Sequence, residues 1–436
     1  MHTASSSEAA LSRADRRAVL ASAVGNCLEL FDLTVFGFFA AVIGAQFFPS
    51  NNPLVSILSS FATFALGFLM RPAGALLLAP LGDKLGRKTL LSLTMMLMGL
   101  ASLGIGILPD YATIGLAAPL LLILLRLIQG FAAGGEWGGA VSMMVEHAPE
   151  TRRGFIGSFQ QVGFGLGILL GTLFAWGINN GLSPAQVQAW GWRLPFLFGA
   201  LVTPIALLIR HRVSESPEYQ KARQKGEVSA HPLSEVWKYH RRGVLCVVGI
   251  GTLGTAAGYI ANQFMSNFAV GTLGLPAGKV SLAIMLASVL QTVLIPFWGW
   301  VSDKVGRLQV IGGAAFIYLI IIYPLFSALA HMPSMSALII LTFCCAIVIS
   351  ASFGPLPALI SELFPATIRT TAISVGYNLA AALFGGCAPL VSAWLIAVSG
   401  SLVSPSWYAL ACAIITTATC FGLLRRRTLL IITERN

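Results

Sequence analysis

The stretch GDKLGRKT, residues 82–89, recurs as SDKVGRLQ at residues 302–309, in the second half of the chain. Asp83 then corresponds to Asp303, and Arg87 to Arg307, at an offset of 220 residues. The first copy is not a nucleotide-binding loop, because the pattern G-x-x-x-x-G-K-[ST] needs a glycine where Arg87 stands. The recurrence instead indicates an internal duplication.

A second pair of motifs supports the duplication. EHAPETRR at 146–153 and ELFPATIR at 362–369 share the pattern ExxPxTxR, at an offset of 216 residues and in the same order within each half. Two parallel repeats are typical of transporters whose substrate site lies between the halves, near the middle of the membrane.

Composition and hydropathy predict an all-α integral membrane protein. The chain is 56% hydrophobic and only 10% charged, with a mean hydropathy of +0.82, whereas soluble domains are about 25% charged. A helix needs about 20 apolar residues to cross a bilayer. Twelve runs of this kind predict two pseudo-symmetric six-helix bundles, with spans at 19–46, 55–81, 90–108, 114–145, 155–178, 190–210, 244–270, 279–301, 309–330, 334–361, 372–399 and 404–424.

The charges predict the topology. Of the 27 Lys and Arg residues, 23 fall in the termini or in the loops after even-numbered spans, which places both termini in the cytoplasm by the positive-inside rule. The net charge of +11 therefore reflects topology, and no nucleic-acid partner is expected. The N-terminal hydrophobic run is too long for a cleaved signal peptide. The expected segments are a cytoplasmic N-terminal segment at 1–18, a first bundle at 19–210, a cytoplasmic linker at 211–243, a second bundle at 244–424 and a cytoplasmic tail at 425–436.

These features resemble the major facilitator superfamily over nearly the whole chain, through the D-x-x-G-R motif in both halves and the plan of six spans, a loop and six spans. The stretches GNCLELFD (25–32), GFLMRPAGALLLAPLGDKLGRK (67–88), RLIQGFAAGGEWGGA (126–140) and WGWRLPF (190–196) resemble its metabolite:proton symporter group. That group includes carriers of citrate, α-ketoglutarate, shikimate and proline or betaine. Leu30 departs from the group, which often has an aromatic residue there.

Five ionisable residues fall inside predicted spans, and such residues are functional candidates because burying a charge in a membrane is costly. They are Glu29, Asp32, Arg71, Arg126 and Glu136. At about 1.5 Å of rise per residue, all but Arg126 lie at about the same depth, and Arg126 lies about 15 Å further out. Glu29 and Asp32 are i, i+3 neighbours on one helix face.

The three acids outnumber the two arginines, and a surplus buried carboxylate tends to bind a proton. Asp32, Glu29 and Glu136 are therefore the proton-coupling candidates. Arg126 and Arg71 are candidate anchors for a substrate carboxylate, since arginine suits bidentate recognition. The alternative is that these pairs only hold helices together.

The second half has no Lys, Arg, Asp or Glu deep in a span, so its contribution to a substrate site must be neutral. Each neutral candidate could instead form only a helix–helix hydrogen bond. The neutral substrate-binding candidates of both halves are Asn26, Gln129, Gln160, Gln161, Tyr259, Asn262, Gln263, Gln291, Tyr377 and Asn378.

The repeated loop motifs predict a cytoplasmic gate that holds the inner side closed until the halves rock. The alternative is that their charges serve topology alone. The gate candidates are Asp83, Gly86, Arg87, Glu146, Arg153, Asp303, Arg307, Glu362 and Arg369.

The expected function is a proton-coupled symporter of the bacterial inner membrane. It would import a small organic acid by alternating access, with di- and tricarboxylates ranked first. The alternatives are a zwitterion:proton symporter of the proline or betaine type, a proton-coupled metabolite or drug exporter, and a transporter-shaped receptor. No enzyme motif, cofactor site or metal-ligand spacing is recognised in the sequence. The expected partners are the substrate, protons and the lipid bilayer, and a monomer is expected.

Overall fold

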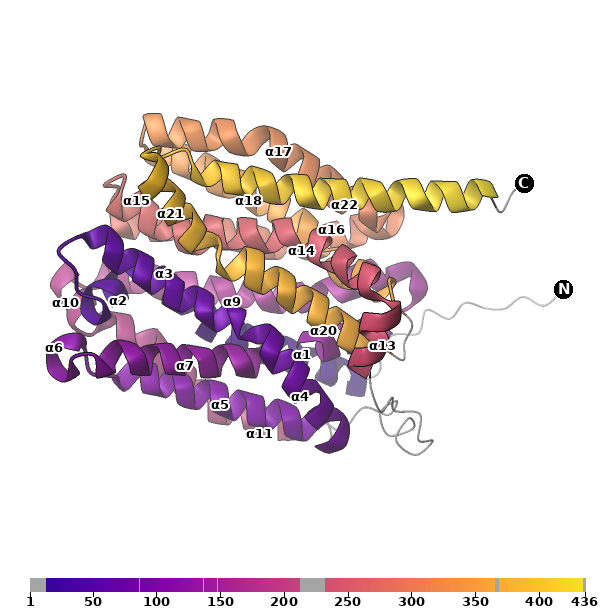
Figure 1. Ribbon diagram of the computed structural model, residues 1–436, viewed down its shortest axis with the longest axis horizontal. Coiled ribbons are helices and arrows are strands. Elements are labelled where there is room, and N and C mark those ends of the chain that lie inside the picture. The colour runs from indigo at the N-terminus through magenta and orange to yellow at the C-terminus, as the bar shows by residue number, and fades with distance from the viewer. Residues whose placement is uncertain are drawn as a thin grey trace.

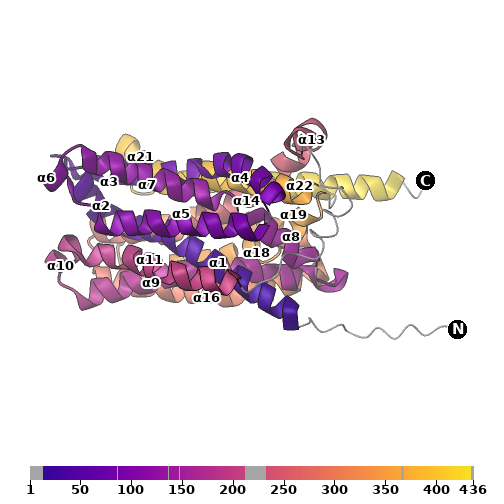
Figure 2. The same ribbon diagram turned by 90° about the horizontal axis from the view of Figure 1, so that it is seen from below.

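The computed structural model describes residues 13–85, 87–135, 137–146, 148–211, 232–364 and 368–433. Its long helices run side by side along one axis, and the two halves of the chain lie next to each other (Figure 1). The start of α1 (Arg13–Phe38), the end of α22 (Pro405–Thr433) and α13 (Pro232–Tyr239) share one end of the bundle (Figures 1 and 2). We call this the inner end and the opposite one the outer end.

The first half contains six spans, several of them broken into two helices. Short helices α6 (Tyr111–Ile114) and α10 (Pro184–Ala189) lie at the outer end (Figure 2). Two 3₁₀ turns cover Glu150–Arg152 and Gly191–Arg193. The spans are α1 with α2 (Ala40–Phe47), α3 (Pro53–Leu69) with α4 (Arg71–Leu85), α5 (Arg87–Ile107), α7 (Ala117–Ala133) with α8 (Trp137–Glu146), α9 (Arg153–Gly181) and α11 (Leu194–His211).

The second half also contains six spans. Two of them include a π-helical segment, Ile260–Phe264 (η3) and Ala381–Gly386 (η4); such segments are frequent at functional sites. The spans are α14 (Arg241–Tyr259) with η3 and α15 (Met265–Gly271), α16 (Ala277–Val305), α17 (Arg307–His331), α18 (Met335–Phe353) with α19 (Leu356–Ser361), α20 (Arg369–Ala380) with η4 and α21 (Ala388–Ser399), and α22.

The described helices confirm an all-α membrane fold. Nine stretches are long and apolar enough to cross a membrane; a tenth is the pair Asn26–Phe38 and Ala40–Phe47, bent by 65°. The shorter apolar stretch Ser92–Ile107 and α11 complete the twelve spans that the sequence predicts. The last apolar stretch is Pro405–Arg425, close to the predicted span 404–424, and the helix α22 itself continues to Thr433.

The halves make their most extensive contact where α9 packs on α16. Small residues allow this close approach. A Cβ atom on Gly154 of α9 would lie 2.6 Å from the carbonyl oxygen of Gly299 on α16, and one on Gly299 would lie 2.7 Å from the carbonyl oxygen of Gly154. Elsewhere α20 packs on α4 and α8, and η4 packs on α3, so residues of both halves surround the middle of the bundle.

Candidate transport site

Arg71 joins the two halves at the middle of the bundle. It is the first residue of α4, and only 1% of its surface is exposed. Its Nη2 atom lies 3.5 Å from Glu29 Oε1 on α1. Its Nε atom donates a hydrogen bond of 3.0 Å to Asn378 Oδ1 on α20, and Asn378 Nδ2 in turn donates to the Gly134 carbonyl at 3.1 Å. We call Glu29, Arg71 and Asn378 the interface triad.

Aromatic side chains of both halves surround the interface triad. The Arg71 guanidinium carbon lies 5.6 Å from the ring centroid of Phe68, whose ring meets that of Tyr259 edge to face at 5.0 Å. Trp137 on α8 stacks on Tyr377 of α20, with centroids 3.5 Å apart and planes 5° apart. These rings exclude water from the triad, which strengthens its electrostatic interactions.

Two buried glutamines on α9 lie near the triad. Asn26 of α1 donates to the backbone carbonyl of Gln160 at 3.1 Å. The side chain of Gln161 lies beside the Tyr377 hydroxyl. Within the described residues, neither Oε1 nor Nε2 of Gln160 has a hydrogen-bond partner, although the residue is fully buried.

Helical phase shows where Gln160 points. Residues four and seven positions further along α9 lie on the same face. Phe164 meets Phe353 of α18 at 5.0 Å, and Gly167 lies against the backbone of Cys27 on α1. The Gln160 side chain therefore points between α1 and the second half.

A second polar group is enclosed within the first half. Arg126 Nη1 donates to Gln129 Oε1 at 2.7 Å, and Gln129 Nε2 donates to Ser102 Oγ at 2.8 Å. Ser102 and Arg126 are also the polar residues that act on the Asp32 carboxylate. We call Asp32, Ser102, Arg126 and Gln129 the first-half cluster, and each is at most 3% exposed.

Aromatic rings lie against the Arg126 guanidinium. Its guanidinium carbon lies 4.7 Å from the centroid of Phe36 and 5.5 Å from that of Phe64. Tyr259 of the second half meets Phe64 edge to face at 5.8 Å and is close enough to interact with the Arg126 charge. Arg126 Nη2 also donates to the Leu33 carbonyl at 3.3 Å. Arg126 is therefore held inside its own bundle.

The structure gives the two acids of α1 different neighbours. Glu29 faces Arg71 at the interface. Asp32 faces α5 and α11: a Cβ atom on Gly199 would lie 2.0 Å from Asp32 Oδ1. Glu136, the third acid, lies outside the described residues. The i, i+3 spacing placed Glu29 and Asp32 on one face, but that face is wide enough to meet two different sets of helices.

The remaining neutral candidates differ in how they are held. Asn262 donates to the Gly258 carbonyl at 2.8 Å and accepts from Ser288 at 3.1 Å, so it is tied within the second half. Gln263 packs against Gly37 of α1, and Gln291 is buried. Ser102 was not predicted, because a serine among MGLASLG gives no signal in the sequence. Trp137 was missed although it directly follows Glu136.

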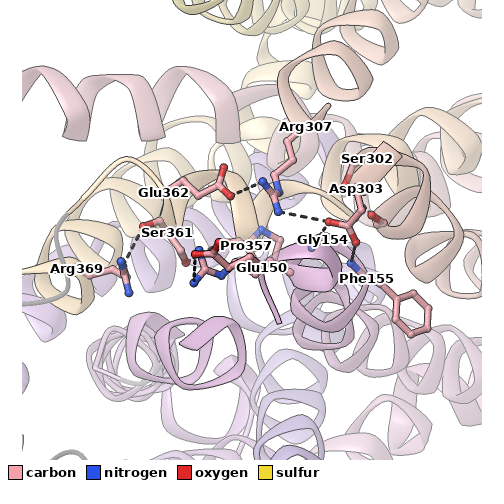
Figure 3. A network of polar contacts seen from close by, with 12 residues as sticks. Glu150, Gly154, Phe155, Ser302, Asp303, Arg307, Pro357, Ser361, Glu362 and Arg369 are labelled. Carbon is pink, nitrogen blue, oxygen red and sulfur yellow. Dashed lines mark hydrogen bonds and ion pairs between the residues drawn. The ribbon is translucent and has the colours of Figure 1, made fainter. Parts of the chain in front are cut away.

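The inner end carries a network across the halves. Asp303 of α16 accepts hydrogen bonds from the backbone N–H groups of Gly154 at 2.7 Å and Phe155 at 2.9 Å, at the start of α9 (Figure 3). Arg307 pairs with Asp303 at 3.4 Å and with Glu362. We call Asp303, Arg307 and Glu362 the inner network; all three are predicted gate residues.

The other predicted gate residues make local contacts or fall outside the description. Arg153 pairs with Glu150 at 3.6 Å, and Arg369 donates to the carbonyls of Ser361 at 2.9 Å and Phe364 at 3.3 Å. Gly86 and the side chains of Asp83, Arg87 and Glu146 lie outside the described part of the chain.

The halves also meet at the outer end. Asn267 of α15 donates to the Gly37 carbonyl at 2.8 Å and accepts from the Ala41 N–H at 3.1 Å. Asn179 of α9 donates to Ser281 of α16 at 3.0 Å. The interface triad is thus buried between contacts at both ends.

Two six-helix bundles, with a buried ion pair of the first bundle hydrogen-bonded to the second, are the arrangement of a membrane transporter. The family model described as "Sugar (and other) transporter" matches residues 18–232, and "Major Facilitator Superfamily" matches residues 247–430. The chain belongs to the metabolite:proton symporter group of the major facilitator superfamily.

Curated relatives cover nearly the whole chain. The shikimate transporter of Escherichia coli (strain K12) is 35% identical over 94% of this chain and 94% of its own length. The citrate-proton symporter of Klebsiella pneumoniae is 33% identical over 96% and 94%. The glycine betaine/proline/ectoine/pipecolic acid transporter OusA of Dickeya dadantii (strain 3937) is 32% identical over 95% and 83%.

Solved structures share the fold at low identity. A D-xylose-proton symporter superimposes with a TM-score of 0.73 at 18% identity, over 93% of this chain and 96% of the other. The partially occluded inward-open xylose transporter XylE from E. coli gives a TM-score of 0.76 at 17% identity, over 95% and 98%.

Proposed function

We propose that this protein imports a small organic acid together with protons across the bacterial inner membrane by alternating access. The observation that carries the proposal is the interface triad, in which one buried arginine contacts an acid of its own half and an amide of the other. The shikimate and citrate-proton carriers among the relatives support an organic acid as the substrate.

The triad suggests how proton and substrate binding are coupled. While Glu29 is ionised, it neutralises Arg71 and repels an anionic substrate. A proton on Glu29 leaves the guanidinium available for a substrate carboxylate, which is the partner that arginine binds best. Binding of the proton to Glu29 and binding of the substrate anion to Arg71 therefore favour each other.

Asp32 is the second candidate for proton transfer. Its Oδ1 atom has no hydrogen-bond partner within the described residues, and a buried charge without full hydrogen bonding is costly. A proton on Asp32 removes that cost and weakens its attraction for Arg126. Because Arg126 lies over Phe64, and Phe64 packs on Tyr259 of the second half, this change can reach the second half through side-chain contacts.

The positive-inside rule places the inner end in the cytoplasm. Rocking of the halves then exposes the interface triad to each side in turn, with the inner network and the Asn267 contacts broken alternately.

A zwitterion of the betaine type is the second candidate substrate, favoured by the relative OusA. Its carboxylate would bind Arg71, and its cationic group would bind Glu29 and the aromatic rings around it.

The test uses purified protein in proteoliposomes. Wild-type protein should accumulate shikimate or citrate when a proton gradient is imposed, and should exchange the same compound without a gradient. Glu29→Gln or Asp32→Asn should abolish accumulation and leave exchange measurable. If Glu29→Gln, Asp32→Asn and Glu136→Gln all keep full proton-driven accumulation, the proposal is wrong.

A further inference from the structure

The charges at the interface limit the number of negative charges that the substrate can have. Arg71 is the cation of the interface triad, and Glu29 faces it. With Glu29 protonated, the triad has a net charge of +1. One carboxylate balances it, whereas each further carboxylate would be a buried charge without a partner, which is strongly unfavourable.

Arg126 is a weaker second cation, because the Asp32 carboxylate beside it offsets its charge. Its Nη1 and Nη2 atoms already donate to Gln129 and to the Leu33 carbonyl, and the rings of Phe36 and Phe64 lie over the guanidinium. Only its Nε atom has no hydrogen-bond partner within the described residues. The second half has no cation deep in a span.

Neutral polar groups dominate the rest of the interface. Gln160 presents both a donor and an acceptor, and neither has a partner within the described residues. The amide of Gln161 and the hydroxyl of Tyr377 lie together nearby. A substrate hydroxyl can donate and accept at once, whereas an alkyl substrate would leave the Gln160 amide buried and unpaired.

We infer that the substrate is a monocarboxylate that carries hydroxyl groups, with the carboxylate on Arg71 and a hydroxyl on the Gln160 amide. The inference rests on the proposed function and sharpens it, because it ranks hydroxylated monocarboxylates above the di- and tricarboxylates that Arg126 would have favoured.

The first experiment measures dissociation constants of the purified protein for four compounds. Shikimate is a ring monocarboxylate with three hydroxyls, cyclohexenecarboxylate is the same ring and charge without them, citrate is a tricarboxylate, and glycine betaine is a zwitterion without hydroxyls. We expect shikimate to bind at least about tenfold more tightly than each of the others, since an unpaired buried amide or charge costs at least that factor.

The second experiment separates recognition from packing. Gln160→Leu, which keeps the size of the side chain, should weaken shikimate binding about tenfold and change cyclohexenecarboxylate binding less than about twofold. Gln188→Leu on α10, where the glutamine is exposed, is the matched control and should change neither constant. Arg71→Lys should weaken both acids, because both use the carboxylate.

The outcomes distinguish the inference from the proposed function. Citrate binding as tightly as shikimate, or Gln160→Leu affecting the two ring acids equally, overturns the inference even if proton-driven uptake is observed. Shikimate binding with the expected pattern but no proton-driven uptake overturns the proposed function and leaves the inference standing. Glycine betaine binding in the absence of any acid binding overturns the inference.

Discussion

Arg193, in the motif WGWRLPF, holds the outer end of α5. Its Nη1 atom donates to the carbonyls of Gly106 at 3.2 Å and Leu108 at 2.6 Å, and its guanidinium carbon lies 4.5 Å from the Trp192 ring centroid. Trp192 in turn donates to Gln46 at 3.1 Å and packs on Phe47 of α2. A cation at the end of a helix satisfies carbonyls that have no partner within that helix. The motif therefore links three spans and lies away from the interface triad.

We predict that Arg193→Ala lowers the stability of the folded protein by about 1–2 kcal/mol, because two charged hydrogen bonds and a ring contact are lost at a half-exposed site. The thermal unfolding temperature in detergent should fall, and the dissociation constant for the best ligand should stay within about twofold. Arg193→Lys should recover little, since lysine cannot reach two carbonyls with a planar fork. A normal unfolding temperature with weakened ligand binding would contradict this structural role.

Two buried arginines of the first half look equivalent in the sequence, and the structure separates their roles. Depth along a helix predicted that Arg126 lies about 15 Å further out than Asp32, but the structure places both residues in the first-half cluster, and depth does not reveal direction. Phe36 and Phe64 cover Arg126, whereas Asn378 binds Arg71 from the other half. Contacts between residues hundreds of positions apart depend on how helices pack, and a single sequence has no local pattern that encodes them.

At the scale of elements, α9 begins with a cap that comes from the other half. The first N–H groups of a helix need acceptors, and an Asp side chain commonly supplies one from the residue before the helix. Here Asp303 of α16 accepts from Gly154 and Phe155 instead. The cap forms only when the halves are closed at the inner end, so it stabilises that closure.

We predict that Asp303→Ala shifts the conformational balance toward opening at the inner end by about 1–2 kcal/mol, the usual cost of a lost cap. Pulsed electron resonance on spin labels at the inner ends of α9 and α16 should show a larger population at long distance, about tenfold in equilibrium constant. Asp110→Ala is the matched control. Asp110 caps α6 through the Thr113 N–H at 3.0 Å within one half, so its loss should leave the distances unchanged. If the distances in Asp303→Ala are unchanged, the cap does not stabilise closure of the inner end, and the charges of the repeated loop motifs serve topology alone.

The spans themselves were predictable, because twelve apolar runs and the duplicated motifs follow directly from hydropathy and spacing. Some of their breaks were not. The 65° bend between α1 and α2 lies within FGFFAA, where no proline marks a kink. The π-helical segments at Ile260–Phe264 and Ala381–Gly386 likewise carry no proline. Packing between the halves decides these features, and hydropathy does not contain that information.

At the scale of the whole molecule, glycines at opposite ends set how closely the halves approach. At the inner end, a Cβ atom on Gly299 would lie 2.7 Å from the carbonyl oxygen of Gly154. At the outer end, a Cβ atom on Gly37 would lie 2.4 Å from Gln263 Cγ. Real Cβ atoms do not approach other atoms this closely, so an alanine at either position must push the halves apart at its own end.

We predict that Gly299→Ala opens the inner end and Gly37→Ala opens the outer end. Spin-label distances should lengthen between α9 and α16 at the inner end in the first variant, and between α2 and α15 in the second. Both variants should transport at least about tenfold more slowly, because alternating access needs both closures. Gly313→Ala on α17, where a Cβ atom would meet nothing within 4 Å, should behave as wild type. If both alanines lengthen the same pair of distances, the two ends do not open in alternation about the interface triad.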